Sequence, residues 1–138
     1  MFCHEVNLRV RYAETDQMQY VYYGNYAIYY EVARVECLRA LGISYKRLED
    51  DGVMLPVLEQ YTKYIAPAHY DDLLTLRVAV KEMPQTRISF EYEIFNEAGR
   101  LLNIAKTTLV FVNKHSQKPT RCPEDLAVLF QPYFSSEA

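Results

Sequence analysis

The sequence predicts an α+β domain in which one antiparallel sheet curls around a single long helix. Three observations lead to this prediction. A strongly apolar stretch with helical periodicity runs from Gly24 to Leu41. Segments in which apolar and polar residues alternate fill most of the chain after residue 53, and tight turns separate them. Such alternation is typical of strands, and short turns join antiparallel neighbours.

The first element is a strand over residues 6 to 12. Here Val6, Leu8, Val10 and Tyr12 alternate with polar residues, which is the period of a half-buried strand. A loop over residues 13 to 23 follows, and we expect it to carry the one aspartate of this region.

The second element is the long helix over residues 24 to 41. A helix that is apolar over most of its circumference is usually buried, so we expect it to lie in the core. Gly42 suits the position just after its C-terminus. Glu31 and Arg34 are three residues apart and are expected to pair on its surface. Two adjoining apolar rows support the helix: Tyr26, Tyr29, Tyr30, Ala33, Cys37 and Leu41, and Ile28, Val32, Val35 and Leu38.

The remaining elements follow a turn-rich segment over residues 42 to 52. The first strand after this segment contains Pro56, which predicts that it is an edge strand or has an end or a bulge there. A second tight turn is expected at Pro84. The chain then closes with a short helix that has Pro123 at its first position and acidic residues in its first turn. The four strands are expected over residues 53 to 65, 73 to 83, 87 to 95 and 100 to 113, and the helix over 122 to 131.

Composition excludes several classes of protein. The 138 residues suit one domain, of which 50% are hydrophobic and 24% charged. A formal charge of −3 argues against a general nucleic-acid binder. No apolar run approaches the roughly 20 residues of a membrane span, and the N-terminus shows no export signal. Three widely spaced cysteines fit a reducing cytoplasm, and neither they nor the histidines show metal-ligand spacing. We therefore expect a cytoplasmic protein with no metal and no cofactor.

One long motif then resembles a known family. The segment RYAETDQMQYVYYGNYAIYYEVARVECLRALG is similar to the signature of the 4-hydroxybenzoyl-CoA thioesterase-like family of acyl-CoA thioester hydrolases, close to its Tol–Pal-associated branch. The later YIAPAHYDDLLTL also resembles that family, and the likeness spans roughly residues 6 to 113. It implies a hot-dog fold, in which a curled antiparallel sheet wraps a central helix, as one domain over residues 1 to 138.

The resemblance also assigns roles to residues. Asp16 stands at the position of the family's catalytic aspartate. Tyr22 and Tyr23 fall where a backbone N–H would hold the thioester carbonyl, and Asn25 follows the family's pattern at the helix start. Glu59 is a candidate for the substrate pocket, contributed from a partner subunit, although a solvated strand face explains it as well. The family pairs edge to edge, which implies a homodimer or homotetramer.

Two departures from the family pattern bear on the chemistry. Gln19 stands where many members have glycine. Tyr23 stands where the Tol–Pal branch often has a histidine that assists proton transfer. Thioester hydrolysis needs a nucleophile, or a base that activates water, together with a group that stabilises charge on the carbonyl oxygen. Asp16 meets the first need by either route, and the N-terminus of the buried helix meets the second.

Other interpretations remain open at this point. Asp16 lies eight residues before Gly24, too far for a helix cap, but it suits an ordinary turn. The tyrosines Tyr22 and Tyr23 are explained equally by packing. The domain could bind acyl thioesters without hydrolysing them, or act on acyl carrier protein thioesters in place of acyl-CoA. A hydratase on the same fold would need a histidine paired with an acid, and none lies near the helix start in the sequence.

Overall fold

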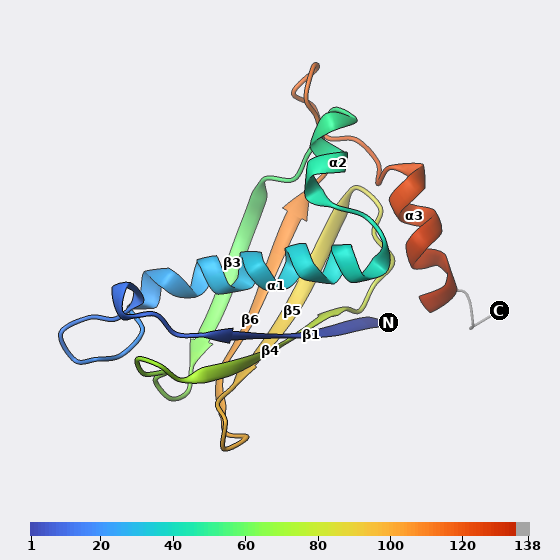
Figure 1. Ribbon diagram of the computed structural model, residues 1–138. Coiled ribbons are helices and arrows are strands. Elements are labelled where there is room, and N and C mark those ends of the chain that lie inside the picture. Colours follow the sequence, from blue (N-terminus) through green and yellow to red (C-terminus); the bar gives the residue numbers. More distant parts are fainter. Residues whose placement is uncertain (135–138) are drawn as a thin grey trace.

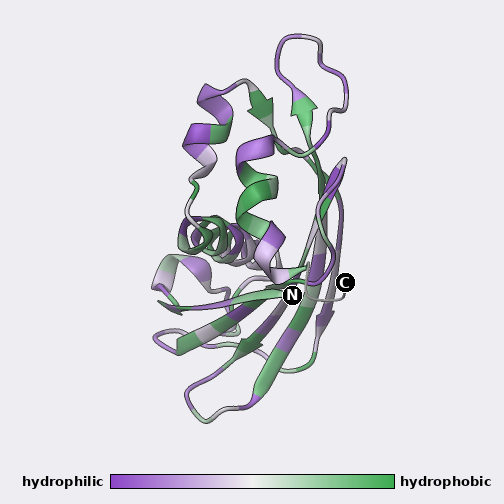
Figure 2. Ribbon diagram, turned by 90° about the vertical axis from the view of Figure 1, so that its right-hand side faces the viewer, coloured by the Kyte–Doolittle hydropathy of each residue, from purple (hydrophilic) through white to green (hydrophobic). Residues whose placement is uncertain are grey.

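The computed structural model describes residues 1–134 and shows one antiparallel sheet with a long helix across it (Figure 1). The sheet order is β1-β4-β5-β6-β3. Viewed from the side, the sheet curves and α1 lies in its hollow (Figure 2). This confirms the predicted α+β class and the hot-dog fold. The elements are β1 (Phe2–Arg9), β3 (Val57–Tyr64), β4 (Leu73–Val80), β5 (Arg87–Phe95), β6 (Leu101–Val110) and α1 (Tyr26–Leu41).

The core lies between α1 and the concave face of the sheet. Strands β4 and β5 bury every second side chain there, as the alternation predicts. Tyr30 of α1 stacks on Tyr92 of β5, with ring centroids 4.7 Å apart. The Tyr30 hydroxyl also donates a hydrogen bond to Asn103 Oδ1, so this buried phenol is satisfied inside the core.

The helix begins and ends close to where the sequence predicts. A 3₁₀ turn, Tyr23–Asn25, leads into α1, and Gly42 ends it with a φ of 121°, a conformation suited to glycine. The prediction of burial over most of the circumference is wrong in one respect. The first half of the second apolar row lies at the surface, where Ile28 is 49% and Val32 37% exposed, whereas Leu38 at its other end is buried in the core.

The strands differ from the prediction at their ends. The first strand begins at Phe2 and ends at Arg9, because the chain turns into a 3₁₀ helix at Tyr12–Glu14. Pro56 interrupts the next predicted strand, as its missing N–H suggests. The piece before it, β2 (Val53–Met54), pairs with β7 (Val112–Asn113) in a small second sheet.

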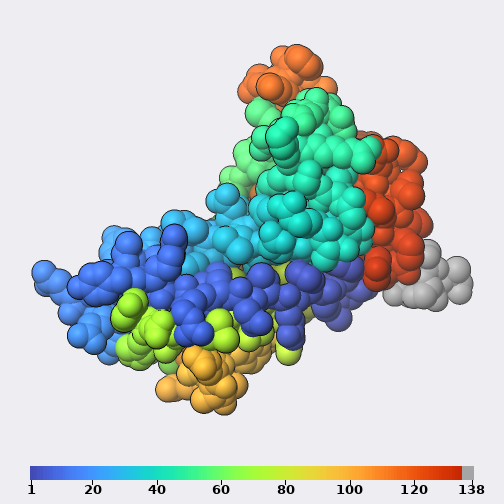
Figure 3. Space-filling view, in the orientation of Figure 1, coloured from blue at the N-terminus to red at the C-terminus, as the bar shows by residue number. Residues whose placement is uncertain are grey.

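Two helical segments also depart from the sequence prediction. The turn-rich segment contains α2 (Tyr45–Asp50), where the Ser44 hydroxyl accepts a hydrogen bond from the Arg47 N–H and caps the helix. The final helix, α3, runs over Glu124–Phe130 and is followed by a 3₁₀ turn at Gln131–Tyr133. Pro123 is the N-cap, so it precedes the first helical residue, whereas the sequence analysis placed it at that first position. In the space-filling view, α1, α2 and α3 form much of the visible face (Figure 3).

None of the helices within residues 1–134 is long and apolar enough to cross a membrane.

Candidate active site

Asp16 sits in a tight turn just before the start of α1. Its Oδ1 accepts a hydrogen bond from the Met18 N–H at 2.9 Å. The Asp16 N–H donates to the Tyr20 carbonyl, and the Gln19 N–H donates to the Asp16 carbonyl, each at 2.9 Å. The turn therefore fixes the backbone of Asp16 and one of its two carboxylate oxygens.

The turn also explains the departure at Gln19. Its φ is 67°, in the left-handed region that glycine adopts without steric cost. The resemblance sets glycine against this position, and the closed turn demands the conformation that glycine adopts most easily. Gln19 adopts it at a cost of about 1 to 2 kcal/mol.

Glu14, two residues before Asp16, anchors the loop to the helix. Its carboxylate is buried at 7% exposure and accepts hydrogen bonds from the Arg11 N–H at 2.8 Å and the Tyr29 hydroxyl at 2.9 Å. The Arg11 guanidinium adds an ion pair at 3.0 Å. The backbone carbonyl of Glu14 accepts hydrogen bonds from the Tyr22 N–H at 2.9 Å and from the Asn25 side-chain amide at 2.8 Å. One residue thus joins the Asp16 loop to the start and the first turn of α1.

The pKa of Glu14 reflects this setting. Burial acts to raise the pKa and is the largest single influence. The Arg11 N–H, the Tyr29 hydroxyl and the Arg11 guanidinium together outweigh it, so the pKa lies below its ordinary value of 4.5. Glu14 is therefore a carboxylate at neutral pH. The sequence analysis did not identify it, although an Arg three residues before a Glu beside the motif was a usable signal.

Tyr22 and Tyr23, which the sequence places at the start of α1, differ in whether their backbone N–H groups are free to bind a substrate. The Tyr22 N–H is already bonded to Glu14. The 3₁₀ turn begins at Tyr23, so the Tyr23 and Gly24 N–H groups are the first two and have no acceptor along the helix. The backbone at Tyr23 is accordingly the better candidate for holding a carbonyl oxygen.

Asp16 and Tyr23 line the same cavity of about 310 Å³, here called the Asp16 cavity. Its walls are strongly aromatic and apolar. They come from the Asp16 loop, from the start of α1 and from the segment that follows β3. The other lining residues are Met18, Tyr20, Val21, Tyr26, Tyr64, Ile65, Ala66 and Pro67. A carboxylate, a helix N-terminus and an aromatic wall therefore meet in one hollow.

The other residues proposed from the sequence lie elsewhere in the single chain. The Tyr22 ring packs against Tyr23 at 4.7 Å between centroids, outside the cavity lining. Asn25 uses its amide to hold the Glu14 carbonyl. Glu59 lies exposed on β3 and lines a separate hollow of about 180 Å³ with Lys106. The structure thus brings Asp16 and Tyr23 together in the lining of the Asp16 cavity and leaves these three residues out of that lining.

The fold brings one histidine nearer than the sequence suggested. His69 pairs with Tyr20 through the backbone, and the two rings lie 5.2 Å apart. Its Nδ1 is 3.8 Å from Asp72 Oδ2. Tyr20 lines the Asp16 cavity, so His69 lies one side chain behind its wall.

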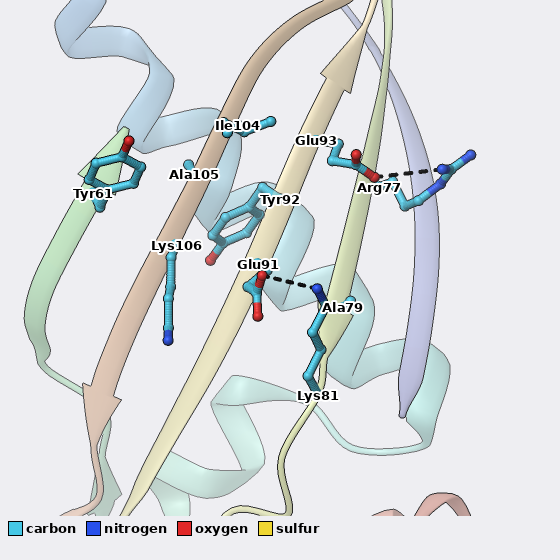
Figure 4. A pocket seen from close by; sticks show the side chains of 10 residues that line it. All are labelled: Tyr61, Arg77, Ala79, Lys81, Glu91, Tyr92, Glu93, Ile104, Ala105 and Lys106. Carbon is cyan, nitrogen blue, oxygen red and sulfur yellow. Dashed lines mark ion pairs between the residues drawn. The ribbon is translucent and has the colours of Figure 1, made fainter. Parts of the chain in front are cut away.

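A larger cavity of about 440 Å³ lies on the face of the sheet away from α1 (Figure 4). Each of its two carboxylates is paired with a basic side chain. Arg77 pairs with Glu93 at 3.6 Å, and Lys81 with Glu91 at 3.1 Å. Both carboxylates of this cavity are thus engaged in ion pairs, which makes it a poor place for a nucleophile or base.

Two cysteines are unsuited to nucleophilic catalysis. Burial raises the pKa of Cys37 to about 12, and burial with the nearby Glu124 carboxylate raises that of Cys122 to about 12. Both remain thiols at neutral pH, and the thiolate is the reactive form. Within residues 1–134, no three His, Cys, Asp or Glu side chains gather in an arrangement that could hold a metal ion.

A curled antiparallel sheet around one long helix defines the hot-dog class. The chain belongs to the thioesterase-like superfamily, which it matches over residues 10–130.

The matches to individual proteins cover most of the chain. It is 34% identical over 119 residues to the putative acyl-CoA thioesterase YneP of Bacillus subtilis, covering 86% of each protein. It is 29% identical over 124 residues to the acyl-CoA thioesterase YbgC of Haemophilus influenzae, covering 89% of this chain and 90% of that one. The solved DHNA-CoA thioesterase from Staphylococcus aureus superposes with a TM-score of 0.85 at 32% identity, covering 99% of this chain and 87% of the other.

Proposed function

We propose that this protein hydrolyses acyl-CoA thioesters, releasing a carboxylic acid and free coenzyme A, with Asp16 as the catalytic carboxylate. The observation that carries the proposal is the Asp16 cavity, which is lined both by Asp16 and by Tyr23, the first residue of the 3₁₀ turn that leads into α1. The family and the acyl-CoA thioesterases among its relatives supply the reaction class. A cytoplasmic location, where acyl-CoA is available, fits the reaction.

The reaction needs one water and no further reagent. By one route, an Asp16 oxygen adds to the thioester carbon, the C–S bond breaks and coenzyme A leaves as the thiolate. Water then cleaves the resulting anhydride. By the other route, Asp16 removes a proton from a water that attacks the same carbon, the C–S bond breaks, and the proton passes to the departing coenzyme A thiolate. In both, the N–H groups of Tyr23 and Gly24 and the positive end of the helix dipole would stabilise charge on the carbonyl oxygen.

Two measurements test this function. The first is thiol release from a panel of short, long and aromatic acyl-CoA thioesters, with the matching acyl carrier protein thioesters to identify the carrier. Binding of every thioester without thiol release would favour a non-catalytic binding domain. The second is a single turnover in ¹⁸O-water. Label in Asp16 shows that an anhydride formed and that water cleaved it at the Asp16 carbon, whereas label in the acid alone shows only that water attacked the acyl carbon.

We expect Tyr23→Phe to change substrate preference or weaken binding by less than about tenfold while the reaction survives. Its role here rests on its backbone N–H, which the substitution keeps, and on the ring, which packs against the acyl group. The check is kcat/KM across the panel, with Tyr12→Phe, an exposed tyrosine outside the cavity, as the control. A loss as deep as that expected for Asp16→Asn would show that the hydroxyl is essential.

The pH profile of the wild type gives a related test of Tyr23. A phenol has a reference pKa near 10 and cannot act as histidine does at neutral pH. We expect a carboxylate limb on the acid side and no limb near pH 6 to 7. Tyr23→His should introduce one. Because His69 lies behind the cavity wall, His69→Gln is the control: a neutral limb that vanishes in this variant would mean that His69 takes part.

We further propose that the protein forms at least a dimer through β3. This strand pairs with β6 on one side and, within residues 1–134, has no strand on the other. Exposed edges promote pairing, and large exposed apolar patches mark interfaces. Tyr64 and Ile65, at and just after the end of β3, also wall the Asp16 cavity, so a second copy would lie beside it. The exposed apolar residues along this edge are Val57, Leu58, Tyr61, Tyr64 and Ile65.

We expect light scattering at micromolar concentration to give a mass of at least twice the 16.2 kDa of one chain. Leu58→Glu places a charge on the β3 edge and should shift the protein toward monomer. Val128→Glu adds the same charge at an exposed apolar residue of α3 and should leave the mass unchanged. A monodisperse 16.2 kDa species for the wild type would refute the dimer.

A further inference from the structure

A second polar site lies farther along α1 and uses none of the Asp16 cavity. Arg34 is buried at 7% exposure, and its Nε and Nη1 have no hydrogen-bond partner among residues 1–134. A guanidinium stays charged at every physiological pH and offers five N–H donors. A buried charge without a partner strongly destabilises a fold, so such a group indicates that something else satisfies it.

Arg34 lines a cavity of about 220 Å³, here called the Arg34 cavity, between α1, α2 and β2. Tyr45 of α2 lines it as well, and the Tyr45 hydroxyl is likewise buried without a partner in the described part of the chain. Burial raises the pKa of Tyr45 to about 12, so it remains a donor at neutral pH. The Tyr45 hydroxyl also lies close enough to Arg34 to interact with its guanidinium, so donors from two helices gather around one hollow.

The acids around this cavity do not neutralise Arg34. Glu31 and Glu49 both line it, and both are exposed. The pair between Glu31 and Arg34 that the sequence predicts is not among the ion pairs within 4 Å that residues 1–134 form. The two acids lie at the surface while the guanidinium lies inside.

We propose that the Arg34 cavity binds a carboxylate that comes from outside this chain. A carboxylate matches the planar fork of a guanidinium with two parallel hydrogen bonds, and the Tyr45 hydroxyl supplies a third donor. A single negative charge also suits a mouth flanked by Glu31 and Glu49 better than a doubly charged phosphate would. A water molecule's share of liquid volume is about 30 Å³, so the cavity admits a small organic acid.

The carboxylate has two possible sources with the same chemistry: a small organic acid, or an acidic side chain of a second copy of this chain. The site does not depend on the proposed hydrolysis, because no residue lines both cavities. Binding at Arg34 can therefore fail while thioester hydrolysis stands, and the reverse also holds.

The test is the thermal midpoint of the wild type in acetate and benzoate, against chloride at equal ionic strength and pH 7. We expect the midpoint to rise by about 4 °C at ten times Kd and to keep rising with the logarithm of the carboxylate concentration above that. Arg34→Met keeps most of the stem and removes the donors, and it should abolish the carboxylate response. Tyr45→Phe should weaken binding about fivefold, the value of one hydrogen bond. If Arg34→Met does not fold, Tyr45→Phe and Glu31→Gln still decide the question.

Glu31→Gln separates an external carboxylate from an internal one. If the ligand comes from outside, removing this negative charge at the mouth should tighten acetate binding. If Glu31 itself swings inward to pair with Arg34, the variant should lower the thermal midpoint and the wild type should not respond to carboxylates. That second result would overturn the proposal.

Self-association identifies the source. If a partner's side chain occupies the cavity, Arg34→Met should weaken the oligomer in light scattering, and free acetate should compete with it. If a small acid occupies it, the mass should stay constant while the thermal midpoint still rises with acetate. A response to acetate that is equal in the wild type and Arg34→Met would contradict both.

Discussion

Asp16→Asn is expected to leave the fold intact and to lower kcat about 10²-fold or more, the usual loss for a general base. The amide oxygen of asparagine can still accept the hydrogen bond from the Met18 N–H, so the turn keeps its geometry. It is neither a nucleophile nor a base. Circular dichroism and thermal unfolding check the fold, and thiol release from the best acyl-CoA checks the rate.

The matched control for Asp16→Asn is Asp51→Asn, at an exposed aspartate at the end of α2. It makes the same chemical change far from the cavity, so we expect wild-type activity. Near wild-type hydrolysis by Asp16→Asn would mean that this carboxylate is a turn residue and that another group performs the chemistry.

Glu14→Gln is expected to lower kcat about tenfold or more with little change in KM. The side chain does not line the Asp16 cavity but ties its loop to α1, so the variant should misplace Asp16 against the helix N-terminus. Small displacements of a reacting group can cost up to about 10²-fold in rate. Glu36→Gln is the control, because Glu36 and Arg39 form the same type of ion pair on the exposed side of α1. A change confined to KM would show that Glu14 is not a positioning residue.

The same substitution should change the pH dependence of stability. The pKa of Glu14 is lower in the folded protein than its ordinary 4.5, so the folded state favours the carboxylate. Its contribution to the free energy of unfolding is fully present above about pH 4.5 and is lost as pH falls through the lower folded value. We expect the stability difference between the wild type and Glu14→Gln to shrink below pH 4.5. A difference that stays constant through acid unfolding would contradict this account of Glu14.

The sequence by itself determined the fold class and the long helix. Periodicity is a local property, so alternation in the later strands and the apolar face of α1 were readable without contacts. The motif around Asp16 indicated the chemistry only through its resemblance to a thioesterase family, which could be recognised because the turn, the aspartate and the helix start are adjacent in the chain. Gly42 correctly marked the end of the helix and Pro56 the break in a strand, because the conformational freedom of glycine and the missing N–H of proline belong to the residues themselves.

Only the tertiary structure decided which groups meet. The buried carboxylate of Glu14 depends on its contacts with Tyr29 and Arg11, and no sequence pattern indicates that a particular acidic side chain will be removed from solvent. The choice of Tyr23 over Tyr22 depends on one hydrogen bond to the Glu14 carbonyl. Arg34 looked like half of a surface pair, yet packing of α2 against α1 buries it without its partner. Hydrophobic periodicity reports which face is apolar, whereas the pairing of polar groups depends on distances between segments that the linear sequence does not contain.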